Sequence, residues 1–215
     1  MIISRGRKYI FVHIPKTGGT SMALALEDRA MADDIMFGDT PKAIRRRRKA
    51  REFQARGRLW KHSTLRDIEG VVTPEEMDEM FVFAMVRNPW DRMVSYYHWL
   101  QTQNFDHPFV HLAKTTNFET FVLDPNMSHA TQISNAESYV TRNDGKLCGD
   151  LFIRLEYLKE DCATLEAHLG FELTIPIANA SRRGEGYQQY YSPQTRDHIA
   201  ALCDRDIAKF DYRFE

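Results

Sequence analysis

The stretch FVHIPKTGGTSM, residues 11–22, decides the beginning of the fold, because an apolar, β-branched run passes directly into a glycine pair. The apolar residues of Tyr9–Ile14 predict a short buried strand. After the glycines, apolar residues recur at every fourth position, which is typical of a helix: Met22, Leu26 and Ala30. The sequence therefore predicts a strand, a tight turn and a helix in that order, the opening of an α/β unit.

The turn itself is built from residue types that bind anions. After a parallel strand, backbone N–H groups of the turn and of the helix start converge, and the helix end adds about half a positive charge. Gly18 and Gly19 allow a close backbone approach, and Lys16 adds a full charge. Thr20 and Ser21 supply hydroxyl donors. These residues predict a phosphate-like ligand, although a Gly-Gly pair can also serve only to make a tight turn.

The order of residues argues against a nucleoside triphosphate. The Walker pattern GxxxxGK[ST] needs a lysine directly after its last glycine, whereas Gly19 is followed by Thr20. The next buried strand ends in Arg87 and not in a magnesium-binding aspartate. The turn is therefore predicted to bind an anion without a metal.

Further strand-and-helix units follow along the chain. MFVFAMV, residues 80–86, is a continuous apolar run, which is typical of a strand buried on both faces. Asn88 is placed to cap the next helix, with Pro89 at its first position. LFIRL, residues 151–155, begins a third unit whose helix ends at Gly170, and Ser192 starts a final helix.

Two long connections, about 33–66 and 103–149, are interpreted as insertions on one domain. We therefore predict a single domain over residues 1–215, with a P-loop-like three-layer α/β/α architecture around a central parallel sheet. The sequence predicts no particular oligomeric state.

The composition limits the cellular location and the classes of binding partner. The chain has 215 residues and a net charge of −1, which gives no overall attraction to nucleic acid or to a membrane. Its start lacks the apolar core of a signal peptide, and its longest strongly apolar run, 80–86, is too short to span a bilayer. The three cysteines are widely spaced and suit a reducing compartment. We expect a cytoplasmic protein without a transmembrane segment.

One segment departs from this neutral balance. Residues 42–66 are rich in Lys and Arg, with Glu52 as the single acid. Such a run can be a solvated helix face, a nucleic-acid-binding segment or a surface for an anionic acceptor. The neutral overall charge and the lack of a recognised binding motif disfavour nucleic acid.

The two polar turns also carry a family resemblance. PKTGGTS, residues 15–21, resembles the 5′-phosphosulfate loop of the sulfotransferase superfamily, and VRNPWDRMVSYYHWL, residues 86–100, resembles its 3′-phosphate motif. FIRLEYLKED, residues 152–161, and the segment 190–212 are similar to later parts of the family. The resemblance is closest to the carbohydrate-type and membrane-type branches and their bacterial relatives.

The resemblance implies a donor, 3′-phosphoadenosine 5′-phosphosulfate (PAPS), and no metal. It places the 5′-phosphosulfate on Lys16, Thr17, Gly18, Gly19, Thr20 and Ser21. It places the 3′-phosphate on Arg87 and Ser95, and arginine suits this role because its planar fork meets two phosphate oxygens. The segment NASRRGEGY, residues 179–187, resembles the family's late nucleotide-closing loop and is also compatible with a plain surface loop. Its candidate donor-binding residues are Arg182, Arg183 and Gly184.

The implied reaction is in-line attack of an acceptor hydroxyl on sulfur, with Lys16 stabilising the leaving phosphate. His62, in WKHSTLR, is the candidate base, although histidines are also often structural or solvent-exposed. Lys61 is an alternative contact for the sulfate or the acceptor, and His13 is expected to pack or to shape the turn. A carbohydrate hydroxyl is the expected acceptor. The alternatives are a non-catalytic nucleotide or anionic-polymer binding protein and, more distantly, a kinase-like P-loop enzyme.

Overall fold

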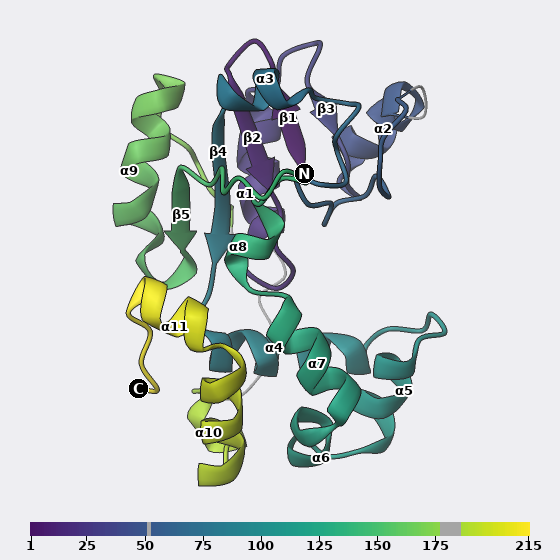
Figure 1. The fold of residues 1–215 in the computed structure, drawn as a ribbon, viewed down its shortest axis with the longest axis vertical. Coiled ribbons are helices and arrows are strands. Elements are labelled where there is room, and N and C mark those ends of the chain that lie inside the picture. The colour runs from purple at the N-terminus through teal and green to yellow at the C-terminus, as the bar shows by residue number, and fades with distance from the viewer. Residues whose placement is uncertain (51–52, 177–185) are drawn as a thin grey trace. The chain divides into compact units, whose positions relative to one another are not determined.

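The computed structural model of the protein describes residues 1–50, 53–176 and 186–215 (Figure 1). The chain divides into two compact units. The first unit comprises Met1–Val86 and Ala136–Asn179, and the second comprises Arg87–Asn135 and Ala180–Glu215. The prediction of a single domain over residues 1–215 stays a prediction.

The first unit contains a five-stranded sheet flanked by helices. Its strands are β1 (Ile2–Ser4), β2 (Tyr9–Val12), β3 (Ile35–Met36), β4 (Phe81–Val86) and β5 (Leu151–Arg154). Its helices are α1 (Gly19–Asp28), α2 (Pro41–Ala50), α3 (Pro74–Asp78), α8 (Ala136–Tyr139), the short 3₁₀ turn η1 (Leu155–Tyr157) and α9 (Leu158–Leu169). The predicted α/β class is confirmed.

The sheet is mixed, with the strand order β3-β1-β2-β4-β5. The β2, β4 and β5 strands run parallel as predicted, with Phe11 paired to Phe83 and Phe83 paired to Leu151. The β1 and β3 strands join them antiparallel, so the predicted parallel arrangement holds for β2, β4 and β5 but not for this edge of the sheet. The reason is local: β1 and β2 are joined by a tight turn in which Lys8 takes a positive φ of 51°, and a short hairpin of this kind reverses the chain.

The core of this unit lies between the sheet and two of its helices. Phe11, Phe83 and Ile153 pack with Met22 of α1 and Leu165 of α9. The residues of β1, β2 and β3 are buried, and β5 is buried at Ile153 and half-buried elsewhere. The burial of β4 is nearly continuous, as MFVFAMV predicts. A strand covered on both faces leaves only its ends open to solvent, so polar chemistry is confined to the turns after the strands.

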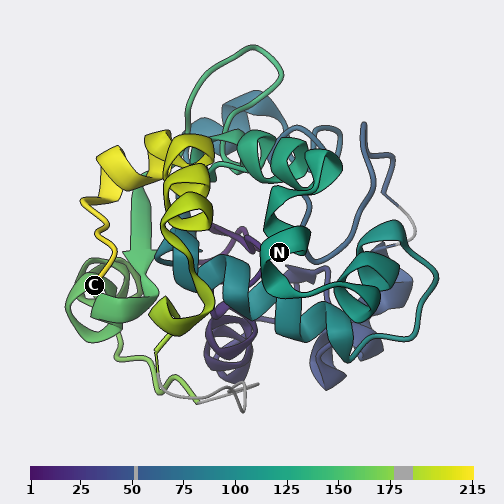
Figure 2. The same ribbon diagram turned by 90° about the horizontal axis from the view of Figure 1, so that it is seen from below.

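In the described residues of the second unit, all regular secondary structure is helical (Figure 2). Its helices are α4 (Pro89–Gln101), α5 (Pro108–Thr115), α6 (Phe118–Leu123), α7 (Pro125–Ile133), the 3₁₀ turn η2 (Gln188–Tyr190), α10 (Pro193–Leu202) and α11 (Asp204–Phe210). The connection 103–149, which has no clear periodicity in sequence, thus contains four short helices, α5 to α8.

The capping predictions are confirmed. The Asn88 side-chain oxygen accepts from the backbone N–H of Trp90 at 3.1 Å and so caps α4, and Ser192 caps α10. Gly170 ends α9 in the left-handed conformation, with φ at 75°. The C-terminal segment differs from the prediction of one final helix. The helix α10 ends at Leu202, Cys203 lies between the two helices, and a second helix, α11, follows.

Candidate active site

The turn between β2 and α1 has a specific and strained backbone. Lys16 has a φ of 67° and Gly18 a φ of 85°, both in the left-handed region. This conformation costs a non-glycine residue about 1 kcal/mol or more, so the position of Lys16 is held by its surroundings. The Thr17 hydroxyl is buried and donates to the Ile14 carbonyl at 2.9 Å, which closes the turn. The hydroxyl of Thr17 therefore serves the shape of the turn.

Gly18 also has no room for a side chain. A Cβ atom there would lie 2.8 Å from Leu155 and 3.3 Å from Met85, in addition to the positive φ. The β4 and β5 region therefore packs directly against the backbone of the turn. Only glycine satisfies both the conformation and this close approach.

The start of α1 presents backbone donors. Gly18 is its N-terminal cap and makes no side-chain capping hydrogen bond, and the Ser21 N–H turns back to the Gly18 carbonyl at 3.0 Å. Within the described part of the chain, the N–H groups of Gly18, Gly19 and Thr20 have no hydrogen-bond acceptor. Together with the partial positive charge of the helix end, these donors suit an anion.

His13 supports this turn from the end of β2. Its ring occupies the space beside Gly19, where an added Cβ would meet the ring at 2.2 Å. Burial lowers the pKa of His13 well below its usual value, with Lys16 and His62 contributing in the same direction. The expectation that His13 packs and shapes the turn is confirmed, and the ring stays neutral at physiological pH.

His62 is bound to His13 through the backbone. The Nδ1 atom of His62 lies 2.7 Å from the His13 carbonyl oxygen, and the two rings meet edge to face with centroids 4.7 Å apart. A carbonyl only accepts, so Nδ1 carries the proton and Nε2 carries the lone pair. The geometry thus selects the tautomer in which Nε2 is the basic atom.

The protonation state of His62 follows from its surroundings. Burial lowers its pKa to about 4, the nearby Lys61 ammonium acts in the same direction, and the hydrogen bond to His13 and the Asp39 carboxylate oppose both. Lys61 is itself paired with Asp39 at 2.5 Å, which keeps the pKa of Asp39 low despite its partial burial. His62 is therefore a neutral imidazole near pH 7.

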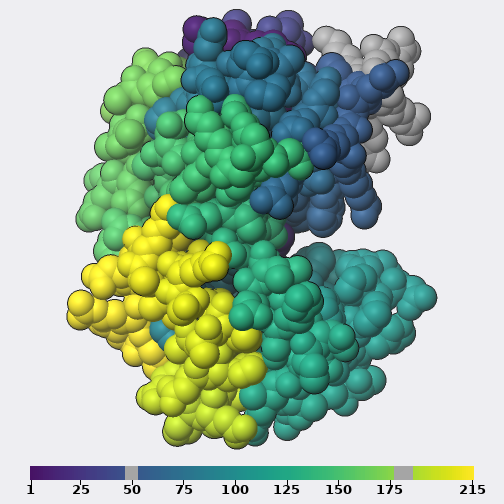
Figure 3. Space-filling view, viewed as in Figure 1, coloured from purple at the N-terminus to yellow at the C-terminus, as the bar shows by residue number. Residues whose placement is uncertain are grey.

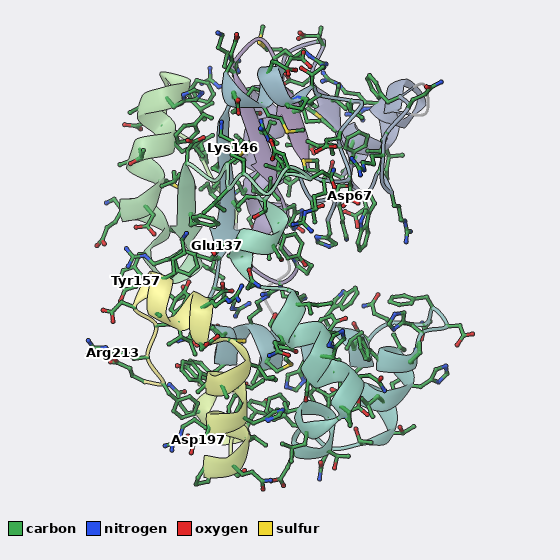
Figure 4. All side chains as sticks on the ribbon, viewed as in Figure 1. Asp67, Glu137, Lys146, Tyr157, Asp197 and Arg213 are labelled. Carbon is green, nitrogen blue, oxygen red and sulfur yellow. The ribbon has the colours of Figure 1, made fainter. Side chains whose placement is uncertain are left out.

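Lys61 and His62 lie in a closed loop. Its two ends are joined by hydrogen bonds from the Arg56 N–H to the Glu69 carbonyl at 2.8 Å and from the Gly57 N–H to the Asp67 carbonyl at 3.1 Å. Gly57 packs so tightly that a Cβ there would lie 2.1 Å from the Asp67 carboxylate. We call residues 56–69 the 56–69 loop; Asp67 is labelled in Figure 4. Loops with joined ends and internal packing hold their side chains in place.

The second unit contains the residues that are predicted to bind the 3′-phosphate. Arg87 follows β4 directly, is 12% exposed, and binds Asp91 with Nε at 2.7 Å and Nη2 at 2.5 Å. Ser95 is buried and comes one helical turn after Asp91, so both lie on one face of α4. Arg87 is thereby directed along the face of α4 that carries Ser95. Sequence reasoning missed this role of Asp91, which the i, i+4 spacing after an arginine that ends a buried strand could have indicated.

The structure thus forms two groups of predicted residues, one in each unit. Lys16–Ser21 and His62 are joined through His13 in the first unit, and Arg87 and Ser95 share a helix face in the second. The candidates Arg182, Arg183 and Gly184 lie outside the described residues. A small pocket beside the turn is lined by His13, Thr20, Glu27, Asp39 and Lys61, among others.

In the described residues, no group of three or more His, Cys, Asp or Glu side chains is arranged to hold a metal ion. None of the helices in the same residues is both long enough and apolar enough to cross a bilayer.

The fold and the turn define an α/β protein of the P-loop-like class. The model of a family described as the sulfotransferase family matches residues 1–213, across both units, and the chain belongs to this family. In fold it is similar to the crystal structure of mouse sulfotransferase SULT7A1 complexed with PAP, with a TM-score of 0.55 and 18% sequence identity over 95% of this chain and 85% of that chain. No curated protein matches the sequence.

Proposed function

We propose that the protein transfers the sulfuryl group of PAPS to an acceptor hydroxyl. The observation that carries the proposal is the pairing of an anion-binding turn with a neutral histidine whose basic nitrogen is defined by a backbone hydrogen bond. Family membership supports the reaction, and the PAP complex of the structurally similar mouse enzyme supports the nucleotide.

The donor would be bound at both of its phosphate ends. The N–H groups of Gly18, Gly19 and Thr20 would surround the 5′-phosphosulfate, with Lys16 supplying charge. The same segment includes Thr17 and Ser21. The backbone of Thr17 and the hydroxyl of Ser21 would complete the predicted set. For the 3′-phosphate the proposed residues are Arg87, Ser95, Arg182, Arg183 and Gly184.

The chain's own residues would then assist the displacement. His62 Nε2 accepts the hydroxyl proton as the acceptor oxygen bonds to sulfur, and the bond from sulfur to the 5′-phosphate oxygen breaks. Lys16 and the turn N–H groups stabilise the negative charge that develops on that phosphate. Proton transfer to a positioned base contributes typically about 10²- to 10⁴-fold in rate.

The low pKa of His62 fits this role once an anion is close by. With a pKa of about 4 the ring is fully available to accept a proton but is a weak base. A bound phosphosulfate favours the imidazolium form and therefore raises the pKa of His62 towards neutrality. Donor binding would thus strengthen the base in the complex where it is needed.

We propose a carbohydrate as the acceptor, on the resemblance to the carbohydrate-type branch and on the basic character of residues 42–66. A cytoplasmic location is also proposed, because Cys148, Cys162 and Cys203 are free thiols that suit a reducing compartment. No metal is proposed for the reaction.

A thermal-shift measurement tests the proposal directly. PAP, the desulfated donor, should raise the melting temperature in the absence of magnesium, and ATP with magnesium should raise it less. Labelled sulfate should then move from PAPS to an acceptor. Stabilisation by ATP with magnesium alone contradicts the proposal, and PAP binding without any transfer favours a non-catalytic nucleotide-binding protein.

A further inference from the structure

The 56–69 loop presents an exposed aromatic ring beside the candidate base. Trp60 is 41% exposed, and its ring meets the His62 ring nearly at a right angle, with centroids 5.0 Å apart. The guanidinium carbon of Arg58, an exposed residue, lies 5.0 Å from the centroid of the Trp60 ring. We call Arg58 and Trp60 the stacking platform. Figure 3 shows part of residues 53–66 at the surface of the first unit.

A buried serine fixes the backbone of the platform. Ser63 is fully buried, and its hydroxyl lies 2.9 Å from the carbonyl oxygens of both Arg58 and Trp60. The same oxygen accepts from the Trp60 N–H at 2.9 Å. The main chain that carries the two side chains is therefore ordered before any ligand arrives, which lowers the entropic cost of binding.

The platform itself carries the positive charge of Arg58. Among the residues that the structure describes, no carboxylate partner of Arg58 is found, whereas Arg56 pairs with Glu69 at 3.2 Å. Lys61 follows Trp60 and shares its charge with Asp39. An exposed indole with the Arg58 guanidinium over it is thus held beside the neutral His62.

We propose that this platform binds one sugar ring of an anionic saccharide and so positions the acceptor hydroxyl for His62. A sugar ring offers an apolar C–H face that packs on an indole, hydroxyls at its rim and, in uronic acids, a carboxylate for Arg58. This inference rests on the proposed sulfotransferase function and specifies its acceptor site. Trp60 and Arg58 are positioning residues for the acceptor.

A purely structural role for Trp60 makes a different prediction. If Trp60 only supports the His62 ring, its removal changes kcat and the pH profile and leaves the acceptor KM unchanged. If it binds the acceptor, its removal raises the acceptor KM and leaves the KM for PAPS unchanged.

The experiment compares the wild type with Trp60→Ala, Arg58→Ala and the control Arg205→Ala, an exposed arginine on α11 outside the basic segment 42–66. Each protein is saturated with PAP and titrated calorimetrically with hyaluronan, chondroitin and heparosan tetrasaccharides, with uncharged chitotetraose and with naphthol. Transfer from labelled PAPS gives kcat and KM for the acceptors that bind.

Trp60→Ala should weaken the binding of the best anionic tetrasaccharide by about tenfold or more. Arg58→Ala should weaken it by a similar factor and leave chitotetraose binding unchanged, and Arg205→Ala should resemble the wild type. Affinity for PAP should be the same in all four proteins.

Three results overturn the inference while PAP binding stays intact. The first is a saccharide affinity of Trp60→Ala equal to that of the wild type. The second is a change in Trp60→Ala that affects kcat alone. The third is binding of naphthol that depends on Trp60 while none of the saccharides binds. If the wild type binds no PAP, the proposed function itself fails, and this inference falls with it.

Discussion

The Nδ1 atom of His62 lies 2.7 Å from the carbonyl oxygen of His13, the residue whose ring packs against Gly19 of the turn between β2 and α1. The candidate base and the turn are therefore connected through one residue. The backbone of His13 sets the tautomer of His62, and its side chain limits the shape of the turn. A substitution in the turn should therefore affect His62, and a substitution at His62 should affect the turn.

Replacing His62 by alanine or asparagine should abolish the proton acceptor. Transfer should fall by about 10²- to 10⁴-fold in both variants, while PAP affinity stays close to that of the wild type. Asparagine can still donate to the His13 carbonyl, so His62→Asn should be more stable than His62→Ala by about 1 kcal/mol. Steady-state kinetics and denaturant unfolding measure the two effects. Normal turnover of both variants removes His62 from the mechanism.

The pH dependence of stability should report His62. Its pKa is about 4 in the folded protein and about 6.5 when unfolded, so the unfolded state binds the proton more readily. Stability is therefore fully present above about pH 6.5 and is lost as the pH falls towards 4, by up to about 3 kcal/mol from this group. The slope should be smaller in His62→Asn, as measured by urea unfolding between these pH values. An identical slope in both proteins contradicts the low pKa.

The pH dependence of turnover should show the effect of the donor. The acidic limb of kcat/KM reflects the base in the protein without substrates, with a pKa of about 4. The acidic limb of kcat reflects the complex, and a bound polyanion should move it to higher pH. Coinciding limbs would show that the donor leaves the pKa of His62 unaffected.

Two variants separate the charge of Lys16 from its backbone strain. Lys16→Gly and Lys16→Ala both remove the ammonium group, so both should lower kcat. The positive φ of 67° is easily adopted by glycine, so Lys16→Gly should be more stable than Lys16→Ala by about 1 kcal/mol. Kinetics and thermal unfolding test the pair. An unchanged kcat with weaker PAPS affinity argues against a role on the leaving group.

Gly19 and His13 should be coupled energetically. Gly19→Ala places a methyl group against the His13 ring, so it should lower both stability and transfer. His13→Ala removes the obstacle while retaining its own carbonyl group. The double variant should therefore be more stable than the two single effects predict, by about 0.5–3 kcal/mol in a double-mutant cycle. If the two effects on stability are strictly additive, the contact between the new methyl group and the His13 ring is not the cause of the destabilisation by Gly19→Ala.

Arg87→Ala should weaken PAP binding, because it removes a guanidinium directed along the helix face that carries Ser95. We expect a loss of about tenfold or more in affinity. Arg205→Ala, on α11 of the same unit, is the control and should bind PAP as the wild type does. Calorimetric titration measures both. Equal affinities of Arg87→Ala and the wild type would exclude Arg87 from the nucleotide site.

The local parts of the fold could be predicted from sequence because their signals are local. The β2 strand, its glycine turn and α1 follow from apolar spacing, and the caps at Asn88 and Ser192 follow from residue type. The antiparallel β1 and β3 strands could not be predicted, because three and two residues carry too little periodicity. The break at Cys203 was missed for a similar reason: the apolar spacing continues across it.

The candidate site divides in the same way. The residues of the turn are neighbours in sequence, so their grouping was predictable. The hydrogen bond from His62 to His13 spans 49 positions and depends on how the 56–69 loop folds back. The exposure of Trp60 and its contact with Arg58 likewise exist only in the folded loop.

The group that selects the tautomer of His62 is a main-chain oxygen and not a carboxylate side chain. No single codon specifies it, since any residue at position 13 supplies the same oxygen. Alanine scanning therefore leaves it in place, and comparison of side chains among related sequences would pass over it. Replacing the peptide bond after His13 by an ester, which weakens the carbonyl as an acceptor, is the direct way to probe it.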